Sequence, residues 1–456
     1  MPHSLSNRIR GSLWEISLWL TENRLENLQK LKQWEQFGPA ETRQLQQNRL
    51  RALLDHCHEN IPYYRSMFKD RGIVSEDGYI DINKFEELPL MDKDTVRSEF
   101  EDLKSDDLST RTWYQNTSGG STGEPVTFIQ DEQYDDWNRA VTTLFRRWTG
   151  YRPGEPWIKL WGSERDLFDE RKAIRSRIGD WLRNQTLLNS FRMGPEEMDE
   201  YLDHMDETKP TFILAYVESI ADLARYAEKE GRTVHSPRAI MTTAGTLYPE
   251  MRETISGVFE ADVYNRYGSR EVGDIACECP NHEGLHVSAP THYVEILDED
   301  GNPVDPGEAG EVVVTSLTNY AMPLVRYRIG DIAVKATEPC SCDCGWPLLS
   351  KVKGRISDVF VAVDGTRVHG EFFTHLFYHE EWVKTFQIVQ EAVDEIRVKV
   401  VTRDGTEPPT NRTGEIRESV QAAMGKCTVT FSVVETIDRT ESGKYRYTVS
   451  KVADDL

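Results

Sequence analysis

Short apolar runs alternate with helical patterns through the middle of this chain, between about residues 112 and 350. Residues 127–129, 212–214 and 239–241 have the character of strands, whereas residues 219–230 have the spacing of a helix. Strands that alternate with helices are typical of α/β domains, in which helices cover the sheet. The pattern therefore predicts a large α/β domain with layered sheets and helices.

Two further regions flank this α/β region. Apolar residues at helical spacing predict two helices within residues 11–60. Near the other end, residues 396–401 and 428–434 resemble strands on either side of a helix at 414–424, which predicts a small α+β domain. The two domains that we expect are residues 1–354 and residues 355–456.

The charge and hydropathy of the chain restrict its partners and surroundings. Acidic residues outnumber basic ones by 77 to 54, and the resulting net charge of −23 would repel a polyanion, which disfavours nucleic acid as a partner. The one run that resembles a signal or membrane segment, residues 13–20, is too short to span a bilayer and is interrupted by Glu15. We therefore expect a cytoplasmic protein without a transmembrane segment.

A segment rich in Gly, Ser and Thr, TSGGSTGEP at residues 117–125, lies between two β-like runs. Its glycines let backbone N–H groups approach phosphate oxygens, and its hydroxyls add further donors. It is not a Walker-type P-loop, because the lysine is missing and a strand follows. Taken alone, the segment fits a surface turn as well as it fits a polyphosphate-binding loop.

Four more motifs follow this loop, and together they decide between the two alternatives. They are YGSRE at 267–271, RIGD at 328–331, GR at 354–355 and GK at 443–444. With these motifs, residues 44–452 resemble the adenylate-forming superfamily, and within it the phenylacetate-CoA ligase group, most closely its branch associated with capsule biosynthesis. The resemblance implies a large adenylate-forming domain, a small mobile C-terminal domain, and the activation of a carboxylic acid as its AMP ester by ATP and Mg²⁺.

The resemblance also implies which residues hold ATP or AMP. The phosphates would contact Thr117, Ser118, Gly119, Thr122 and Gly123. Adenine would lie beside Ala244, Gly245, Thr246, Tyr267 and Gly268. Asp331 would accept hydrogen bonds from both ribose hydroxyls, and two bonds to one carboxylate fix the orientation of the sugar. Arg355, with Gly354, begins the segment where the family hinges between its two half-reactions.

Two residues carry the chemistry that the resemblance implies. Glu271 would bind the Mg²⁺ that bridges phosphate oxygens, since a carboxylate is a hard ligand for a hard cation. Lys444 lies on a Gly-Lys turn from which the family's lysine reaches both the attacking carboxylate and the α-phosphate. A single lysine outside such a motif would more simply be a solvent-exposed side chain.

Cysteine and histidine residues form two clusters. Cys279 and His286 lie just after the Glu271 motif, whereas Cys340, Cys342 and Cys344 form a Cys-x-Cys-x-Cys run. Tetrahedral zinc takes four such sulfur and nitrogen ligands, and ordinary buried thiols are the alternative. Some phenylacetate-CoA ligase relatives carry a similar set, which would match the first two residues and two of the last three. Which two depends on the alignment. Because protein groups would fill every position, we expect the zinc to be structural.

The acid and the final acyl acceptor are less constrained. Coenzyme A is the leading acceptor, with a carrier-protein thiol or an amine as alternatives. A non-catalytic nucleotide-binding homologue is a third interpretation, which the joint presence of Glu271, Asp331 and Lys444 argues against. Four aromatic residues fit a pocket for an aromatic acid, although such residues more often belong to a core. They are Trp157, Trp161, Tyr216 and Tyr248.

Overall fold

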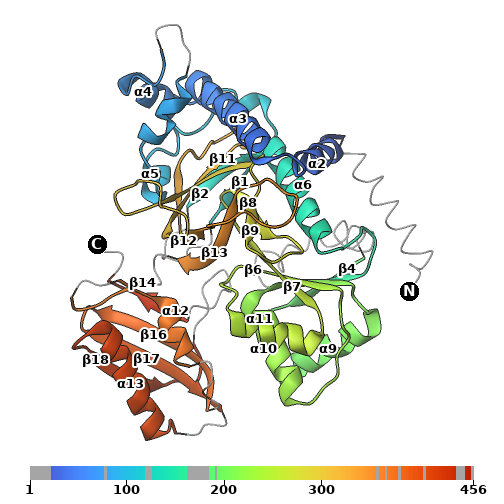
Figure 1. The fold of residues 1–456 in the computed structure, drawn as a ribbon, viewed down its shortest axis with the longest axis vertical. Coiled ribbons are helices and arrows are strands. Elements are labelled where there is room, and N and C mark those ends of the chain that lie inside the picture. The colour runs from blue at the N-terminus through green and yellow to red at the C-terminus, as the bar shows by residue number, and fades with distance from the viewer. Residues whose placement is uncertain are drawn as a thin grey trace. The chain divides into compact units, whose positions relative to one another are not determined.

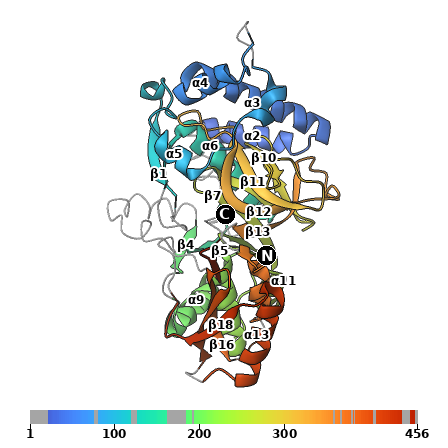
Figure 2. The same ribbon diagram turned by 90° about the vertical axis from the view of Figure 1, so that its left-hand side faces the viewer.

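The computed structural model describes residues 22–75, 80–118, 126–161, 184–190, 193–355, 359–364, 367–377, 380, 382–403, 407–437 and 447–452. The chain divides into two compact units. The larger comprises Met1–Ile329 with Ala333–Val352, and the smaller comprises Gly330–Ile332 with Lys353–Leu456. Helices and sheets pack together in each unit (Figures 1 and 2), so the predicted α/β fold class is confirmed.

The main sheet of the described residues is mixed and has eleven strands. They are β3 (Trp157–Trp161), β4 (Gln185–Asn189), β5 (Phe212–Tyr216), β6 (Ala239–Thr243), β7 (Asp262–Ser269), β8 (Gly273–Glu278), β9 (Leu285–Val287), β10 (His292–Leu297), β11 (Ala309–Ser316), β12 (Tyr327–Lys335) and β13 (Leu348–Arg355). Their order is β10-β11-β12-β13-β9-β8-β7-β6-β5-β3-β4. Neighbours from β4 to β7 are parallel, and β7, β8 and β9 pair antiparallel. All five residues of β5 and of β6 are buried, as parallel strands covered on both faces require.

The described helices of the larger unit are α2 (Glu22–Trp34), α3 (Pro39–Asn60), α4 (Pro62–Asp70), α5 (Lys93–Ser98), α6 (Glu132–Trp148), α9 (Pro195–Thr208), α10 (Val217–Lys229) and α11 (Pro249–Phe259). Short 3₁₀ helices span Ile82–Glu87 and Leu108–Thr110. The predicted helix at 219–230 is α10, which contacts β5 and β6 through buried residues at positions 217, 220, 221, 224 and 227 (Figure 1). That spacing of three and four residues forms one apolar face.

The predicted helices within residues 11–60 correspond to α2 and α3. Ile61, at the end of α3, has an extended backbone with φ −114° and ψ 111°. The following Pro62 disfavours the helical conformation at Ile61, and it occupies the first turn of α4, where its missing N–H costs nothing. Leu50, Leu53 and Leu54 of α3 are buried in a core that also includes strands of the main sheet.

Helix α6 connects the main sheet to a separate two-stranded hairpin of β1 (Trp113–Thr117) and β2 (Thr127–Asp131). Asp131 caps α6, because its carboxylate accepts a hydrogen bond from the Tyr134 N–H at 2.8 Å. One face of α6 packs on α2 in a second core, where Val141 and Phe145 meet Leu31. The helix therefore has a fixed position between the hairpin and β8.

The smaller unit contains β14 (Val359–Val361), β15 (Arg367–His369), α12 (Gly370–His375), β16 (Val383–Ala392), β17 (Glu395–Thr402), α13 (Thr410–Met424), β18 (Thr428–Val433) and β19 (Thr448–Ser450). Its sheet has the order β18-β17-β16-β19. Ile416, Val420 and Met424 recur every four residues along α13 and pack on a core with Ile388 and Val398. The predicted strand, helix and strand are therefore all present. No helix among the described residues has the length and apolar character needed to cross a bilayer.

Candidate functional site

The base of the TSGGSTGEP loop is a closed hairpin. Thr117 of β1 lies opposite Thr127 of β2. Beyond this pair, the Ser118 N–H donates to the Val126 carbonyl at 2.8 Å, and the Val126 N–H donates to Ser118 Oγ at 3.0 Å. The chain therefore enters the loop and returns from it at one point. Because Ser118 Oγ acts as an acceptor in this closure, its O–H is still available to donate.

A buried glutamine connects this hairpin to the Glu271 motif. Gln130 of β2 is 1% exposed, and its Oε1 accepts a hydrogen bond from Asn116 Nδ2 at 3.1 Å. Its Nε2 donates to the backbone carbonyls of Arg270 at 2.8 Å and Glu271 at 3.2 Å. One amide thus joins the strand that enters the loop to the turn that carries Glu271. Burial makes these bonds expensive to lose.

Glu271 lies on the turn between β7 and β8. The residue is 8% exposed, and within the described part of the chain its carboxylate makes no hydrogen bond or ion pair. Gly273, the first residue of β8 after this turn, has φ +88°, and a Cβ there would overlap Asn138 Oδ1 of α6. Asn138 Oδ1 also accepts from the Asp274 N–H at 3.0 Å. Helix α6 therefore holds the turn, and a nearly buried carboxylate without a protein cation suits a divalent metal ion.

The residues expected to contact adenine follow strand β6. Ala244 has a left-handed backbone with φ +62°, which is unfavourable for a residue with a side chain. A Cβ at Gly245 would overlap the carboxylate of Glu218, in the first turn of α10. Thr246 is half-buried. A sharp reversal and close packing on α10 therefore require small residues here, as the expected adenine site does.

The remaining residues that we expect to bind the nucleotide are distributed over several strands and loops. Tyr267 and Gly268 lie in β7, and a Cβ at Gly268 would overlap the Gly273 carbonyl. Asp331 lies in β12 and is mostly buried, and Arg355 ends β13. The side chain of Arg355 lies outside the described residues, as do Gly119, Thr122, Gly123 and Lys444. Their roles stay predictions.

Four of the predicted zinc ligands converge in the larger unit. The ligand atoms of Cys279, His286, Cys340 and Cys342 all lie within 4.8 Å of one another. Cys279 Sγ is 3.6 Å from Cys340 Sγ, and Cys342 Sγ is 3.2 Å from His286 Nε2. A tetrahedral zinc, with bonds of about 2.3 Å to sulfur and about 2.0 Å to nitrogen, separates its ligand atoms by roughly 3.5–3.8 Å. The donor set and its spacing therefore fit a zinc ion.

The surroundings of this cluster orient its ligands. His286 Nδ1 lies 3.4 Å from the Trp346 carbonyl, which leaves Nε2 directed at the cysteines. The Glu283 carboxylate accepts hydrogen bonds from Ser341 N–H at 2.5 Å and Ser341 Oγ at 2.7 Å. This contact holds the loop between Cys340 and Cys342 in place. Such outer contacts are typical of metal sites in proteins.

Cys344 and His282, which lie close to these ligands in the sequence, do not join the ligand group. Cys344 packs against the core that contains Trp346, and burial raises the pKa of its thiol to about 12. Of the alternatives that the sequence leaves open, the pair Cys340 and Cys342 matches this arrangement, and the choice of ligands stays a prediction. His282 instead contacts the Glu278 carboxylate through Nδ1 at 3.2 Å.

Two parts of the chain match models of known protein families. Residues 360–451 match the family model of the CapK C-terminal domain, and residues 186–321 match that of AMP-binding enzymes. The chain is 24% identical to protein CapK of Staphylococcus aureus over 416 residues, which cover 90% of this chain and 89% of that protein. It is 23% identical to phenylacetate-coenzyme A ligase of Thermus thermophilus, over 91% and 90% of the two chains.

These matches make the chain similar to the adenylate-forming superfamily and, within it, to the phenylacetate-CoA ligases, so the resemblance seen in its motifs is confirmed. Solved structures agree in fold. A 2-hydroxyisobutyryl-CoA ligase in the postadenylation state has a TM-score of 0.72 at 19% identity, over 93% of both chains. The amide bond synthetase McbA from Marinactinospora thermotolerans has a TM-score of 0.51 at 18% identity, over 71% of this chain and 65% of that one.

Three residues that position the site have no signal in the motifs. They are Gln130, Asn138 and Glu218. Each is a polar residue in a strand or helix whose sequence gives no sign that its side chain is turned toward another segment. The usable clues were the glycines at 245 and 273, since a glycine at the edge of a functional motif often marks close approach by a neighbour.

Proposed function

We propose that this chain uses ATP and Mg²⁺ to activate a carboxylic acid as an acyl-adenylate, and then transfers the acyl group to the thiol of coenzyme A. The observation that carries the proposal is the nearly buried Glu271 carboxylate, joined through Gln130 to the hairpin that opens into the TSGGSTGEP loop. The loop offers donors for phosphate oxygens, and the carboxylate offers a ligand for the metal that accompanies them.

The first half-reaction brings two anions together. The carboxylate oxygen attacks the α-phosphorus, an acyl-phosphate bond forms, and pyrophosphate leaves. Thr117, Ser118, Thr122 and Gly123 would hold the departing phosphates, and Glu271 would hold the Mg²⁺ that neutralises them. Lys444 would neutralise the charge that builds between the carboxylate and the α-phosphate. These roles rest on the match of each residue to the family's motifs.

The rest of the nucleotide would occupy the ends of the central strands. Adenine would lie against the reversal after β6 formed by Ala244, Gly245 and Thr246, where even a Cβ at Gly245 would overlap the Glu218 carboxylate. Tyr267 would pack on its face beside Gly268. Asp331 would accept hydrogen bonds from the ribose, with Arg355 nearby as a further AMP contact.

The second half-reaction needs a different set of contacts. The thiol attacks the acyl carbonyl carbon, a thioester forms, and AMP leaves. We place the boundary between the domains after residue 354, with residues 355–456 as a lid that pivots at Gly354 and Arg355. The division of the chain into two compact units near Lys353 supports this boundary.

The zinc ion has a structural role in this proposal. Cys279, His286, Cys340 and Cys342 would supply all four ligands, which leaves no position for a substrate or a reactive water. The ion would link the region of β8 and β9 to the loop that precedes β13. Zinc therefore stabilises the larger unit and takes no part in the transfer.

Product analysis tests this function and its acceptor. Wild-type protein is incubated with ATP, Mg²⁺ and a panel of acids, with coenzyme A, a carrier protein or an amine added in turn, and the products are identified by mass spectrometry. We expect acyl-AMP without an acceptor and acyl-CoA when coenzyme A is present. Thioester on the carrier protein, or amide, formed in preference to acyl-CoA would replace the proposed acceptor.

The role of Lys444 is tested in the same assay. Lys444→Ala should form acyl-AMP more slowly by a factor on the order of 10² or more, because charge stabilisation at the reacting centre is lost. Lys426→Ala, at an exposed position of the same unit, is the matched control and should keep the wild-type rate. Equal rates for Lys444→Ala and wild type would remove Lys444 from the mechanism.

A further inference from the structure

A buried ion pair joins strands β7 and β8 beside two of the residues expected to bind MgATP. Arg266 Nη1 donates to Asp274 Oδ2 at 3.2 Å, and the two side chains are 10% and 13% exposed. Arg266 directly precedes Tyr267, and Asp274 lies three residues after Glu271. Because both charges lose hydration on burial, such a pair adds little net stability. It can instead favour one arrangement of the chain over others.

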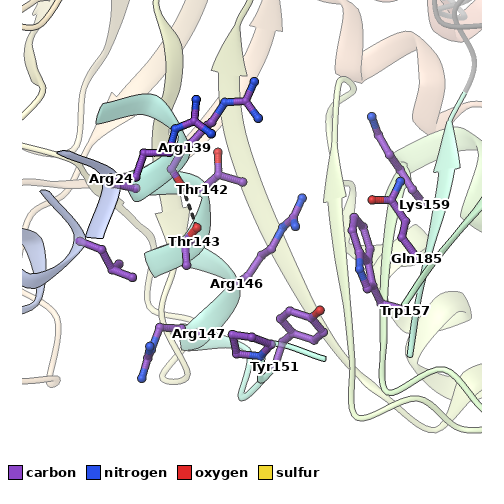
Figure 3. A pocket seen from close by; sticks show the side chains of 13 residues that line it. Arg24, Arg139, Thr142, Thr143, Arg146, Arg147, Tyr151, Trp157, Lys159 and Gln185 are labelled. Atoms are coloured by element: carbon purple, nitrogen blue, oxygen red, sulfur yellow. Dashed lines mark hydrogen bonds between the residues drawn. The ribbon is translucent and has the colours of Figure 1, made fainter. Parts of the chain in front are cut away.

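Helix α6 fixes the acidic partner of this pair. The Asp274 N–H donates to Asn138 Oδ1 at 3.0 Å, and Thr142 Oγ1 donates to Asp274 Oδ2 at 2.6 Å. Figure 3 shows Thr142 on α6. The carbonyl of Asn138 lies 2.9 Å from the same hydroxyl, but the charged oxygen is the stronger acceptor for its single proton. The backbone and the carboxylate of Asp274 are thus both held by one helix.

The pairing of β7 with β8 is irregular at this point. Tyr267 lies opposite Ala276, whereas the next residue, Gly268, lies opposite Asp274. Ile275 is therefore an extra residue of β8, and the pairing has a β-bulge there. A bulge changes the direction of the side chains beside it, and bulges are common next to active sites.

The ion pair depends on this bulge. Residues two apart in a strand face the same side of the sheet, so Arg266 and Gly268 share a face. Asp274 lies opposite Gly268 and therefore shares that face too. In a regular pairing Asp274 would lie opposite Ser269, on the other face of the sheet. The ion pair can therefore form only while the bulge is present.

We propose that Arg266 and Asp274 are positioning residues, which keep the bulge in place and thereby aim Tyr267 at the adenine of the bound nucleotide. The inference rests on the proposed function, in which Tyr267 packs on the face of adenine. Neither charged side chain contacts the nucleotide itself. Both act through the direction that β7 takes at residues 267 and 268.

Calorimetric titration with two probes tests the inference. AMP, which carries the base, and tripolyphosphate with Mg²⁺, which lacks it, are titrated separately into the full chain. Asp274→Asn keeps the size of the side chain but removes its charge. We expect this variant to bind AMP about tenfold more weakly than wild type and to bind tripolyphosphate within about twofold of wild type. Equal weakening of both probes would indicate a general disturbance of the site and would overturn the inference.

Two further variants show whether lost stability accounts for the result. Glu295 of β10 accepts hydrogen bonds from Arg326 at 2.8 and 3.1 Å in another buried ion pair of the main sheet. The matched control Glu295→Gln should bind AMP as wild type does. Thr142→Val removes only the hydroxyl contact to Asp274, so it should weaken AMP binding in the same direction as Asp274→Asn but less. This milder variant decides the question if Asp274→Asn does not fold.

A double-mutant cycle separates positioning from a structural role. In a Tyr267→Leu background, Asp274→Asn should have little further effect on AMP affinity, because the ring that it positions is gone. An equal loss of AMP affinity in both backgrounds would overturn the inference, and so would wild-type affinity in both Asp274→Asn and Thr142→Val.

Pyrophosphate exchange distinguishes this inference from the proposed function. If wild type binds AMP but catalyses no exchange with any acid, the proposed function fails, and the comparison of AMP affinities still decides the role of Asp274. If wild type does not bind AMP, both proposals are overturned.

Discussion

Replacing Gln130 by leucine tests whether its amide positions Glu271 against the phosphate loop. The substitution conserves most of the volume but removes three hydrogen bonds: one from Asn116 and two to the carbonyls of Arg270 and Glu271. Gln130 is only 1% exposed, so water has little access to the partner groups and replaces the lost hydrogen bonds poorly. Each buried polar group left unpaired costs about 1–3 kcal/mol, and we expect a total loss of roughly 2–4 kcal/mol in unfolding free energy.

The effect on activity should exceed the effect of lost stability. A shift of about 1 Å between the loop and the Glu271 turn would slow adenylation by a factor on the order of 10². Gln46→Leu is the matched control, since Gln46 is also buried and its one side-chain hydrogen bond among the described residues, at 2.7 Å, goes to the His292 carbonyl and not to the hairpin or to residues 270 and 271. It should destabilise the protein by about 1–3 kcal/mol and keep the exchange rate within about twofold.

Urea denaturation and pyrophosphate exchange, measured on the same preparations, separate the two effects. The expected result is comparable loss of stability in both variants and a large loss of exchange in Gln130→Leu alone, with a raised KM for MgATP. If Gln130→Leu loses stability but exchanges at the rate of Gln46→Leu, the amide is only structural and the positioning argument is refuted.

Three further predictions concern other parts of the larger unit. Gly273→Ala should lower the free energy of unfolding by about 2 kcal/mol or more in a denaturant titration, because φ is +88° and the new methyl group would overlap Asn138. The control Gly257→Ala in α11 should be neutral or stabilising. Equal effects of the two substitutions would contradict the packing argument. Metal analysis of protein purified without added zinc should find about one equivalent of zinc. The Cys344→Ser variant should keep this zinc, and the Cys342→Ser variant should lose it. Less than about a tenth of an equivalent of zinc in wild type would exclude the site. Burial lowers the pKa of His292 from 6.5 to about 4, so the unfolded chain binds the extra proton more readily than the folded one. The free energy of unfolding should therefore fall by up to about 3 kcal/mol as the pH drops from 6.5 to 4. His292→Gln should reduce this dependence of stability on pH, and an unchanged dependence would contradict the prediction.

The fold followed from local patterns. Continuous apolar runs marked β5 and β6, because strands covered on both faces need no polar alternation. Helix α10 followed from its spacing. The antiparallel half of the main sheet was harder to predict, since β13 pairs with β9 across some sixty residues and no local signal sets that register.

The same strand register explains why the sequence indicates a zinc site but does not decide which two of the three clustered cysteines bind the metal. Leu348 lies opposite His286, and this pairing determines which cysteines of the preceding loop reach the imidazole. Sequence spacing alone treats Cys340, Cys342 and Cys344 alike. Gln130 illustrates a different limit, because a glutamine in a strand reveals its role only when its burial and its partners are known.

The most direct test of acyl-adenylate formation is exchange of labelled pyrophosphate into ATP. Wild-type protein should catalyse exchange only when Mg²⁺ and a suitable carboxylic acid are both present. Glu271→Gln should lower the rate by a factor on the order of 10² or more, because a ligand for the metal is lost. No exchange with any acid in a broad panel, from protein that still binds ATP, would contradict the proposal and indicate a non-catalytic nucleotide-binding homologue.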